Sequence, residues 1–216
     1  MSNLKTTRLL PPMLTPMLPL MLALSLASGA AVAATATVGQ AAPTFSATDA
    51  SGKTVALADL KGKTVVLEWV NPECPYVRKH YDSANMQATQ KAAAGKGVVW
   101  LSVNSTHASH SDYKKPAEML AWTQKQGAAP SATLMDGEGK IGRAYGARTT
   151  PHLYVIDAKG MLAYAGGIDD KASANPADVK TAKNYVNAAL ADLQSGKPVV
   201  QAVTRAYGCS VKYSDG

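Results

Sequence analysis

Cys74 stands where an apolar run typical of a buried strand, residues 64–70, gives way to a segment typical of a helix. Pro75 follows it, and proline is favoured at the first helical position, where its missing N–H group costs little. The unpaired N–H groups of a first helical turn and the positive end of the helix dipole stabilise a thiolate. The sequence therefore predicts that Cys74 is a nucleophile at the N-terminus of a helix.

Charged residues near Cys74 act on the thiol in opposite directions. Arg78 and Lys79 lie one turn further into the expected helix and should add positive potential, whereas Glu73 opposes them. The balance favours the thiolate. His80 lies on a different face of this helix, and we expect it at the protein surface.

The pattern around Cys74 extends into a strand–helix–strand unit. A helix is expected over residues 75–94, because Gly95 and Gly97 follow it, and residues 98–104 form a second apolar strand. Two short runs at 42–49 and 54–57, separated by turn residues, indicate an N-terminal hairpin. The same signals predict further helices over 116–126, 141–145 and 176–194, and further strands over 132–135, 152–157 and 161–165.

The first 34 residues are typical of a secretory signal peptide. Lys5 and Arg8 precede an apolar run over 9–27, and the small residues that end at Ala34 suit a signal peptidase. An uncleaved membrane anchor is the alternative, but four prolines interrupt the apolar run. We expect cleavage, no stable membrane anchor afterwards, and a periplasmic or secreted protein with a domain over 35–197 and a tail over 198–216.

Composition limits the remaining choices. An apolar content of 46% in 216 residues allows one buried core, so we expect a single domain after the signal peptide. The net charge of +7 falls to +5 when Lys5 and Arg8 are removed, and the basic residues form no dense block, so we expect no nucleic-acid partner. Export permits disulfides, and the mature chain keeps an even number of cysteines, Cys74 and Cys209.

The order strand, helix and strand, followed by Thr150-Pro151, a hairpin and a helix, resembles the thioredoxin fold. The leading segment, with Ala42-Pro43 and Phe45, is similar to the redoxin branch that includes alkyl-hydroperoxide-reductase and thiol-specific-antioxidant proteins. Residues 71–81 and 207–213 resemble an exported, peroxiredoxin-like subgroup of that branch. The resemblance implies an α/β protein with a central mixed sheet flanked by helices, an N-terminal β-hairpin extension and a C-terminal tail.

The resemblance also implies roles for three residues besides Cys74. Glu68 matches the buried carboxyl group that exchanges a proton with the thiol, although an exposed edge or a lysine partner is the alternative for this side chain. Pro151 matches the cis-proline that faces the active cysteine. The backbone of Thr150 would then be free to pair with an extended substrate segment.

Two motifs of related families are absent. Val77 stands where thioredoxins have a second cysteine, and Leu67 and Asn71 replace the proline and hydroxyl residue of the peroxiredoxin motif. Cys209 is therefore the cysteine that can react with Cys74. The eleven residues after Pro198 span roughly 35 Å when extended, enough for Cys209 to approach Cys74.

These features predict an enzyme, an exported thiol–disulfide oxidoreductase with Cys74 as nucleophile and Cys209 as resolving thiol. Its partners would be protein thiols or disulfides and an unidentified reductant, with no cofactor and no metal. One alternative is a peroxiredoxin-like thiol peroxidase that reacts with peroxide. The other is a non-enzymatic module in which a permanent Cys74–Cys209 disulfide pins the tail.

Overall fold

The structure is a computed structural model that describes residues 1–2 and 35–214 of the chain. The predicted signal peptide lies outside the described residues except for its first two positions, so its cleavage stays a prediction. Among the described residues, no helix has the length and apolar character needed to cross a membrane.

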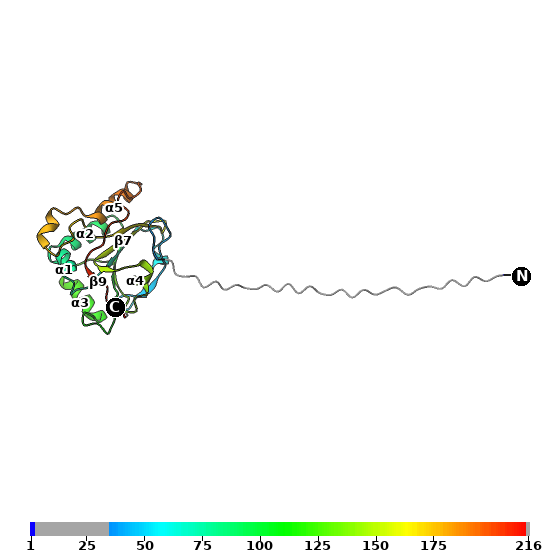
Figure 1. Cartoon of the computed structure of the whole chain (residues 1–216), viewed down its shortest axis with the longest axis horizontal. Helices are drawn as coiled ribbons and strands as arrows, with labels where there is room; N and C mark the ends of the chain where they lie inside the picture. The colour runs from blue at the N-terminus through cyan, green and yellow to red at the C-terminus, as the bar shows by residue number, and fades with distance from the viewer. Residues whose placement is uncertain (3–34, 215–216) are drawn as a thin grey trace. The chain divides into compact units, whose positions relative to one another are not determined.

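Five strands form the central sheet in the order β5-β4-β3-β7-β8 (Figure 1). β3, β4 and β5 are parallel, whereas β7 is antiparallel to both β3 and β8, so the sheet is mixed. All residues of β3 are buried, as expected for a continuous apolar strand that is covered on both faces. The strands are β3 (Val65–Trp69), β4 (Val99–Asn104), β5 (Ala132–Met135), β7 (His152–Ile156) and β8 (Leu162–Gly166).

Helices cover both faces of this sheet (Figure 1). The first face, which carries Val66 and Trp100, packs against α1 (Pro75–Asp82), α2 (Asn85–Ala94), α3 (Pro116–Lys125) and α5 (Tyr185–Gln194). The second face, which carries Val65 and Leu67, packs against α4 (Lys140–Tyr145) and the hairpin of β1 (Ser46–Thr48) and β2 (Thr54–Ala56). Two short 3-10 helices, η1 (Leu57–Leu60) and η2 (Pro176–Lys180), complete the helical elements of the described residues.

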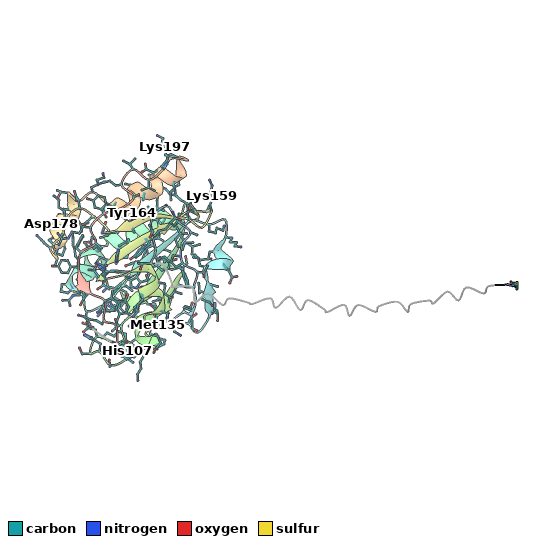
Figure 2. All side chains as sticks on the ribbon, turned by 45° about the vertical axis from the view of Figure 1, so that its right-hand side comes forward. His107, Met135, Lys159, Tyr164, Asp178 and Lys197 are labelled. Carbon is teal, nitrogen blue, oxygen red and sulfur yellow. The ribbon has the colours of Figure 1, made fainter. Side chains whose placement is uncertain are left out.

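The predicted fold class and N-terminal hairpin are confirmed. Figure 2 shows the side chains on this framework, in which Tyr164 of β8 is buried in the core while Lys159 and Lys197 are exposed. Trp69 and Trp100 are buried in opposite faces of the sheet, as core residues.

The prediction of one helix over 75–94 is wrong, because α1 and α2 are separated by Ser83 and Ala84. Ala84 has a left-handed backbone with φ 58°, and it precedes the first residue of α2. The Gln87 side-chain amide donates a hydrogen bond of 2.8 Å to the Tyr81 carbonyl oxygen, which satisfies one acceptor at the end of α1. Neither glycine nor proline marks this break, so the local sequence carried no signal for it.

The prediction of one helix over 176–194 is also wrong. η2 ends at Lys180, and α5 begins only after Asn184, whose side-chain oxygen accepts a hydrogen bond of 2.9 Å from the Asn187 N–H group. The Tyr185 N–H group donates to the Ile168 carbonyl oxygen at 2.9 Å. This long-range contact draws the segment before α5 onto the chain that follows β8, which interrupts the helix.

The C-terminal tail has no helix in its described part and packs along the domain. Thr204 lies beside β8, where its side-chain oxygen is 2.6 Å from the Tyr164 hydroxyl oxygen. Further along, β9 (Cys209–Ser210) pairs with β6 (Thr149–Thr150), and the Tyr213 hydroxyl donates to the Ala147 carbonyl oxygen at 2.8 Å. The tail is therefore held on both sides of Cys209.

Candidate active site

Cys74 occupies the position immediately before α1, as predicted. Its backbone is extended, with φ −74° and ψ 122°, and its carbonyl oxygen accepts the first helical hydrogen bond from the Arg78 N–H group at 3.0 Å. Pro75 is the first helical residue. The side chain of Cys74 therefore lies at the end of α1 where the N–H groups are unpaired, although only 1% of the residue is exposed.

The tail brings Cys209 directly to Cys74. The two sulfur atoms are 2.7 Å apart, and the Cys74 sulfur also lies 3.0 Å from the Thr150 carbonyl oxygen. Gly208 has φ 142°, and a Cβ at this position would collide with that same carbonyl oxygen. Glycine before Cys209 therefore allows the tail backbone to approach closely enough for the sulfur atoms to meet.

The peptide bond between Thr150 and Pro151 is cis, as predicted. The backbone of Thr150 is not free, however, because it pairs in antiparallel register with Cys209. The expectation of an open edge is therefore corrected: the chain's own tail occupies the place predicted for an extended substrate.

The two cysteines differ in burial, because Cys74 is buried and Cys209 is partly exposed. Cys209 is half-buried, and burial together with the neighbouring Cys74 sulfur raises its pKa to about 12. Cys209 is therefore protonated at neutral pH when both thiols are reduced.

Polar contacts next to Cys74 connect it to the loop after β4. The Glu73 carboxylate forms an ion pair with Lys114 at 2.7 Å, which offsets the charge that was expected to oppose the thiolate. The Asn71 side-chain amide donates to Asp112 at 2.9 Å, and its oxygen accepts from the Glu73 N–H group at 2.9 Å. These bonds fix the turn that leads from β3 to Cys74.

The surface position predicted for His80 is wrong, and Lys79 does not add positive potential at Cys74 as expected. Both are buried, and the Lys79 ammonium group lies 3.2 Å from the Asp169 carboxylate, so its charge is compensated there rather than directed at Cys74. The His80 Nε2 atom is 3.2 Å from the Tyr207 hydroxyl oxygen. Burial lowers the pKa of His80 to about 4, which keeps the ring neutral at pH 7. The partners come from distant segments, which a helical pattern cannot reveal.

Glu68 is fully buried on the face of β3 that packs against α1 and α2, which excludes an exposed edge. Its carboxyl group accepts hydrogen bonds from four side chains, and burial raises its pKa despite them. None of the four partners is a cysteine, so a role in proton exchange stays a prediction. The partners are Tyr81 at 2.8 Å, Trp100 at 2.7 Å, Gln90 at 3.2 Å and Ser102 at 3.3 Å.

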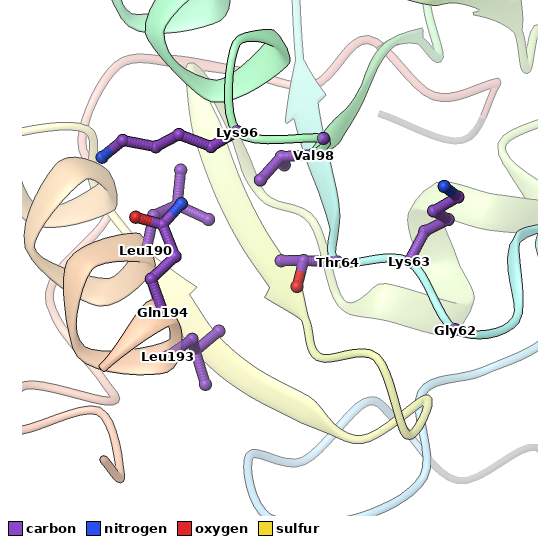
Figure 3. A pocket seen from close by; sticks show the side chains of 9 residues that line it. Gly62, Lys63, Thr64, Lys96, Val98, Leu190, Leu193 and Gln194 are labelled. Atoms are coloured by element: carbon purple, nitrogen blue, oxygen red, sulfur yellow. The ribbon is translucent and has the colours of Figure 1, made fainter. Parts of the chain in front are cut away.

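A cavity of about 270 Å³ lies between the segment that leads into β3 and the end of α5 (Figure 3). A five-residue strand is about 17 Å long. Cys74 follows the far end of β3, so this cavity is not part of the cysteine site. The cavity is lined by Gly62, Lys63, Thr64, Lys96, Gly97, Val98, Leu190, Leu193 and Gln194.

Within residues 35–214, no cluster of three histidine, cysteine or acidic side chains is arranged to hold a metal ion.

Solved structures with the same fold include proteins of unknown and of named function. An uncharacterized conserved protein from Geobacillus kaustophilus is 26% identical, with a TM-score of 0.73 over 83% of this chain and 94% of that one. A hypothetical protein from Sinorhizobium meliloti 1021 is 24% identical, with a TM-score of 0.71 over 85% and 98%. A candidate thiol:disulfide interchange protein DsbE from Chlorobium tepidum is 24% identical, with a TM-score of 0.50 over 61% and 85%.

No curated protein matches the chain. Its family is shown by the sequence from residue 38 to residue 165, which matches the AhpC/TSA family model and covers more than half of the chain. This region contains β3, Cys74 and the cis-proline, and Cys209 lies beyond it. Its fold is thioredoxin-like, and the chain belongs to the AhpC/TSA family.

Proposed function

We propose that this protein is a thiol–disulfide oxidoreductase whose working couple is Cys74 and Cys209. The observation that carries the proposal is the distance of 2.7 Å between the two sulfur atoms, with Cys74 at the N-terminus of α1. The position of Cys74 suits a nucleophile, and a second sulfur at this distance needs little movement to form a bond with it.

The reaction begins with the Cys74 thiolate, which attacks one sulfur of a substrate disulfide. A Cys74–substrate disulfide forms, and the other substrate sulfur leaves as a thiolate that takes up a proton. Cys209 then loses its proton and attacks the Cys74 sulfur, which forms the Cys74–Cys209 disulfide and releases the second substrate thiol. Two electrons pass from the cysteines to the substrate, and an external thiol reductant returns them.

The step that a buried base would assist is the loss of the Cys209 proton, since burial raises the pKa of this thiol. We propose Glu68 as the buried group that takes part in this proton exchange. Its support is a carboxyl group held in the core beneath α1 with a raised pKa, which favours proton transfer closer to neutral pH.

The proposal is tested with single cysteine variants and a disulfide substrate such as oxidised glutathione. Cys74→Ser should reduce turnover to the uncatalysed level, because it removes the nucleophile. Cys209→Ser should lose steady turnover but accumulate a mixed disulfide on Cys74, which mass spectrometry detects. Ser210→Ala, a change at the exposed neighbour in β9, is the control and should keep activity within about twofold of wild type. Turnover that survives Cys74→Ser would refute the assignment.

A peroxidase is the second candidate, and one observation favours it. The buried Thr150 hydroxyl has no hydrogen-bond partner among the described residues, and the carbonyl oxygen of the same residue contacts the Cys74 sulfur. In this reaction the Cys74 thiolate attacks hydrogen peroxide and releases hydroxide. The resulting sulfenic acid condenses with Cys209 and releases water. A stopped-flow rate with hydrogen peroxide no faster than that of free cysteine would exclude this candidate.

We also propose that the mature protein works in the periplasm or outside the cell, on protein thiols or disulfides. The support is the N-terminal pattern of Lys5, Arg8 and the apolar run that ends before Ala34. Sequencing the N-terminus of the exported protein should give Thr35 as the first residue. Recovery of only the full-length chain from the cytoplasm would contradict this proposal.

A further inference from the structure

A buried polar cluster joins the helix that begins at Cys74 to the tail that carries Cys209. Lys79 and His80 come from α1, Asp169 follows β8, and Tyr207 lies two residues before Cys209. Each of the four is at most 9% exposed. The reactions proposed above use none of them.

Tyr207 is the member of this cluster that belongs to the tail, and its hydroxyl contacts the other three side chains. It donates a hydrogen bond to the Asp169 carboxylate, and it lies 3.3 Å from the Lys79 ammonium nitrogen and 3.2 Å from His80 Nε2. Asn85 donates to Nδ1 of His80 at 2.8 Å, which leaves Nε2 of the neutral ring to donate to Tyr207.

The ring of Tyr207 makes contacts that do not depend on the hydroxyl. The Lys79 ammonium nitrogen lies 5.3 Å from the ring centroid, and the Tyr76 ring packs edge-on at 5.9 Å. A phenylalanine at position 207 would keep both contacts. The hydroxyl can therefore be removed separately from the ring.

The tail covers the active cysteine. Cys74 is only 1% exposed, and the strand position beside Thr150 is taken by Cys209. An extended polypeptide cannot pair with Thr150 unless β9 leaves it. Tyr207 lies two residues before β9 in the chain, so bonds that hold Tyr207 in place also limit how far β9 can move.

We propose that Tyr207 is a positioning residue of the Cys74–Cys209 couple: its hydroxyl, bound in the Lys79–Asp169–His80 cluster, holds Cys209 against Cys74 and closes Cys74 to polypeptide partners. The role of the Tyr207 hydroxyl in turnover rests on the proposed function. Its effect on the tail does not, since the tail covers Cys74 whether or not the protein turns over a substrate.

The test measures how often the tail opens in the reduced protein. In a Cys209→Ser background, Cys74 is the remaining cysteine, and its labelling by a maleimide attached to polyethylene glycol requires the tail to lift. Tyr207→Phe should raise the labelling rate at least tenfold. Tenfold corresponds to about 1.4 kcal/mol, a change that one hydrogen bond to a buried carboxylate can supply.

A matched control separates the effect of the Tyr207 hydroxyl on the tail from general destabilisation of the fold. Tyr145 is also buried, and its hydroxyl donates to the Pro43 carbonyl oxygen at 2.7 Å, away from the tail cluster. Tyr145→Phe should leave the labelling rate within about twofold of the background. In otherwise wild-type reduced protein, Tyr207→Phe should speed hydrogen exchange at residues 203–211 and leave β3 and β4 unchanged.

A second variant opens the tail without touching the cluster. Gly208→Ala places a methyl group against the Thr150 carbonyl oxygen and should also raise the labelling rate at least tenfold. Gly196→Ala is its control, since Gly196 also has a positive φ, of 69°, but nothing lies near its absent Cβ, and labelling should not change.

Three results would overturn the proposal. The first is a labelling rate within twofold of the background for Tyr207→Phe while Gly208→Ala labels fast. The second is labelling at the background rate for both variants, which would show that these changes in the tail do not expose Cys74. The third is global unfolding of Tyr207→Phe, which would show that the hydroxyl supports the whole fold rather than the tail. Absence of turnover with any disulfide would contradict the proposed function and leave these outcomes intact.

Discussion

Two of the buried titratable residues, Glu68 and His80, give opposite pH dependences, and each can be examined separately. For Glu68, burial raises the pKa of the folded state above the reference value of 4.5. The stability associated with the protonated carboxyl group is complete below that value and is lost as the pH rises through the folded-state pKa, because only the folded state still binds the proton.

Glu68→Gln removes this titration while keeping a polar group within reach of Trp100 and Tyr81. The unfolding free energy of the variant relative to wild type should therefore increase as the pH rises from 4.5, by at most about 1.4 kcal/mol per pH unit. Urea unfolding at a series of pH values measures the difference. A difference that is constant with pH would show that folding does not raise the pKa of Glu68.

His80 has the opposite sign. Its pKa is lowered from 6.5 to about 4 by burial, so the unfolded chain binds a proton between these values while the folded protein does not. The protein should lose stability as the pH falls from 6.5 towards 4, by up to about 1.4 kcal/mol per pH unit from this residue. His80→Gln should flatten that part of the profile in the same urea titrations, and an unchanged slope would contradict the buried neutral ring.

At the level of single elements, the start of α5 depends on one side chain. Asn184 accepts a hydrogen bond from the Asn187 N–H group and also donates to Thr89 of α2 at 3.2 Å. Asn184→Ala should lower the unfolding free energy by about 1 to 2 kcal/mol, a typical loss for a helix cap. Chemical denaturation measures this loss. Asn187→Ala, a change one turn later in the same helix, is the control, and an equal loss for both variants would argue against a capping role for Asn184.

The elements that the sequence predicted well are those with strong local signals. The run of buried residues in β3, Pro75 after Cys74 and Gly146 after α4 placed the strands and most helix ends correctly. The sequence does not predict the break at Ala84, because neither glycine nor proline marks it, or the gap before Asn184, because a contact with a distant segment maintains it. Distant partners also explain why the surface position predicted for His80 is wrong and why Lys79 does not direct its charge at Cys74, since Asp169 and Tyr207 approach them only in the folded chain.

For the molecule as a whole, the resemblance to the redoxins predicted the fold and the cis-proline, and the length of the tail allowed Cys209 to reach Cys74. Neither the resemblance nor the tail length predicted the path that the tail follows along the domain. β9 closes the edge next to Thr150 that appeared open, because Gly208 permits a backbone approach that other residues would block.

Oxidation of the pair should change the stability of the entire domain. A Cys74–Cys209 bond closes a loop with a sequence separation of 135 residues. On the chain-entropy model, such a bond stabilises the folded state by about 5 kcal/mol. Guanidinium unfolding of the oxidised and reduced proteins should differ by several kcal/mol. The Cys209→Ser variant is the control and should show no dependence on redox conditions.

The reduction potential of the Cys74–Cys209 pair tests most directly whether the two residues form a working couple. Equilibration of the protein with glutathione or dithiothreitol buffers, followed by counting of free thiols, gives this value. A working couple should have a potential above about −300 mV, within reach of cellular thiol reductants. A value well below about −300 mV would identify a permanent structural bond, and failure of the two cysteines to form an intramolecular disulfide would equally contradict the account.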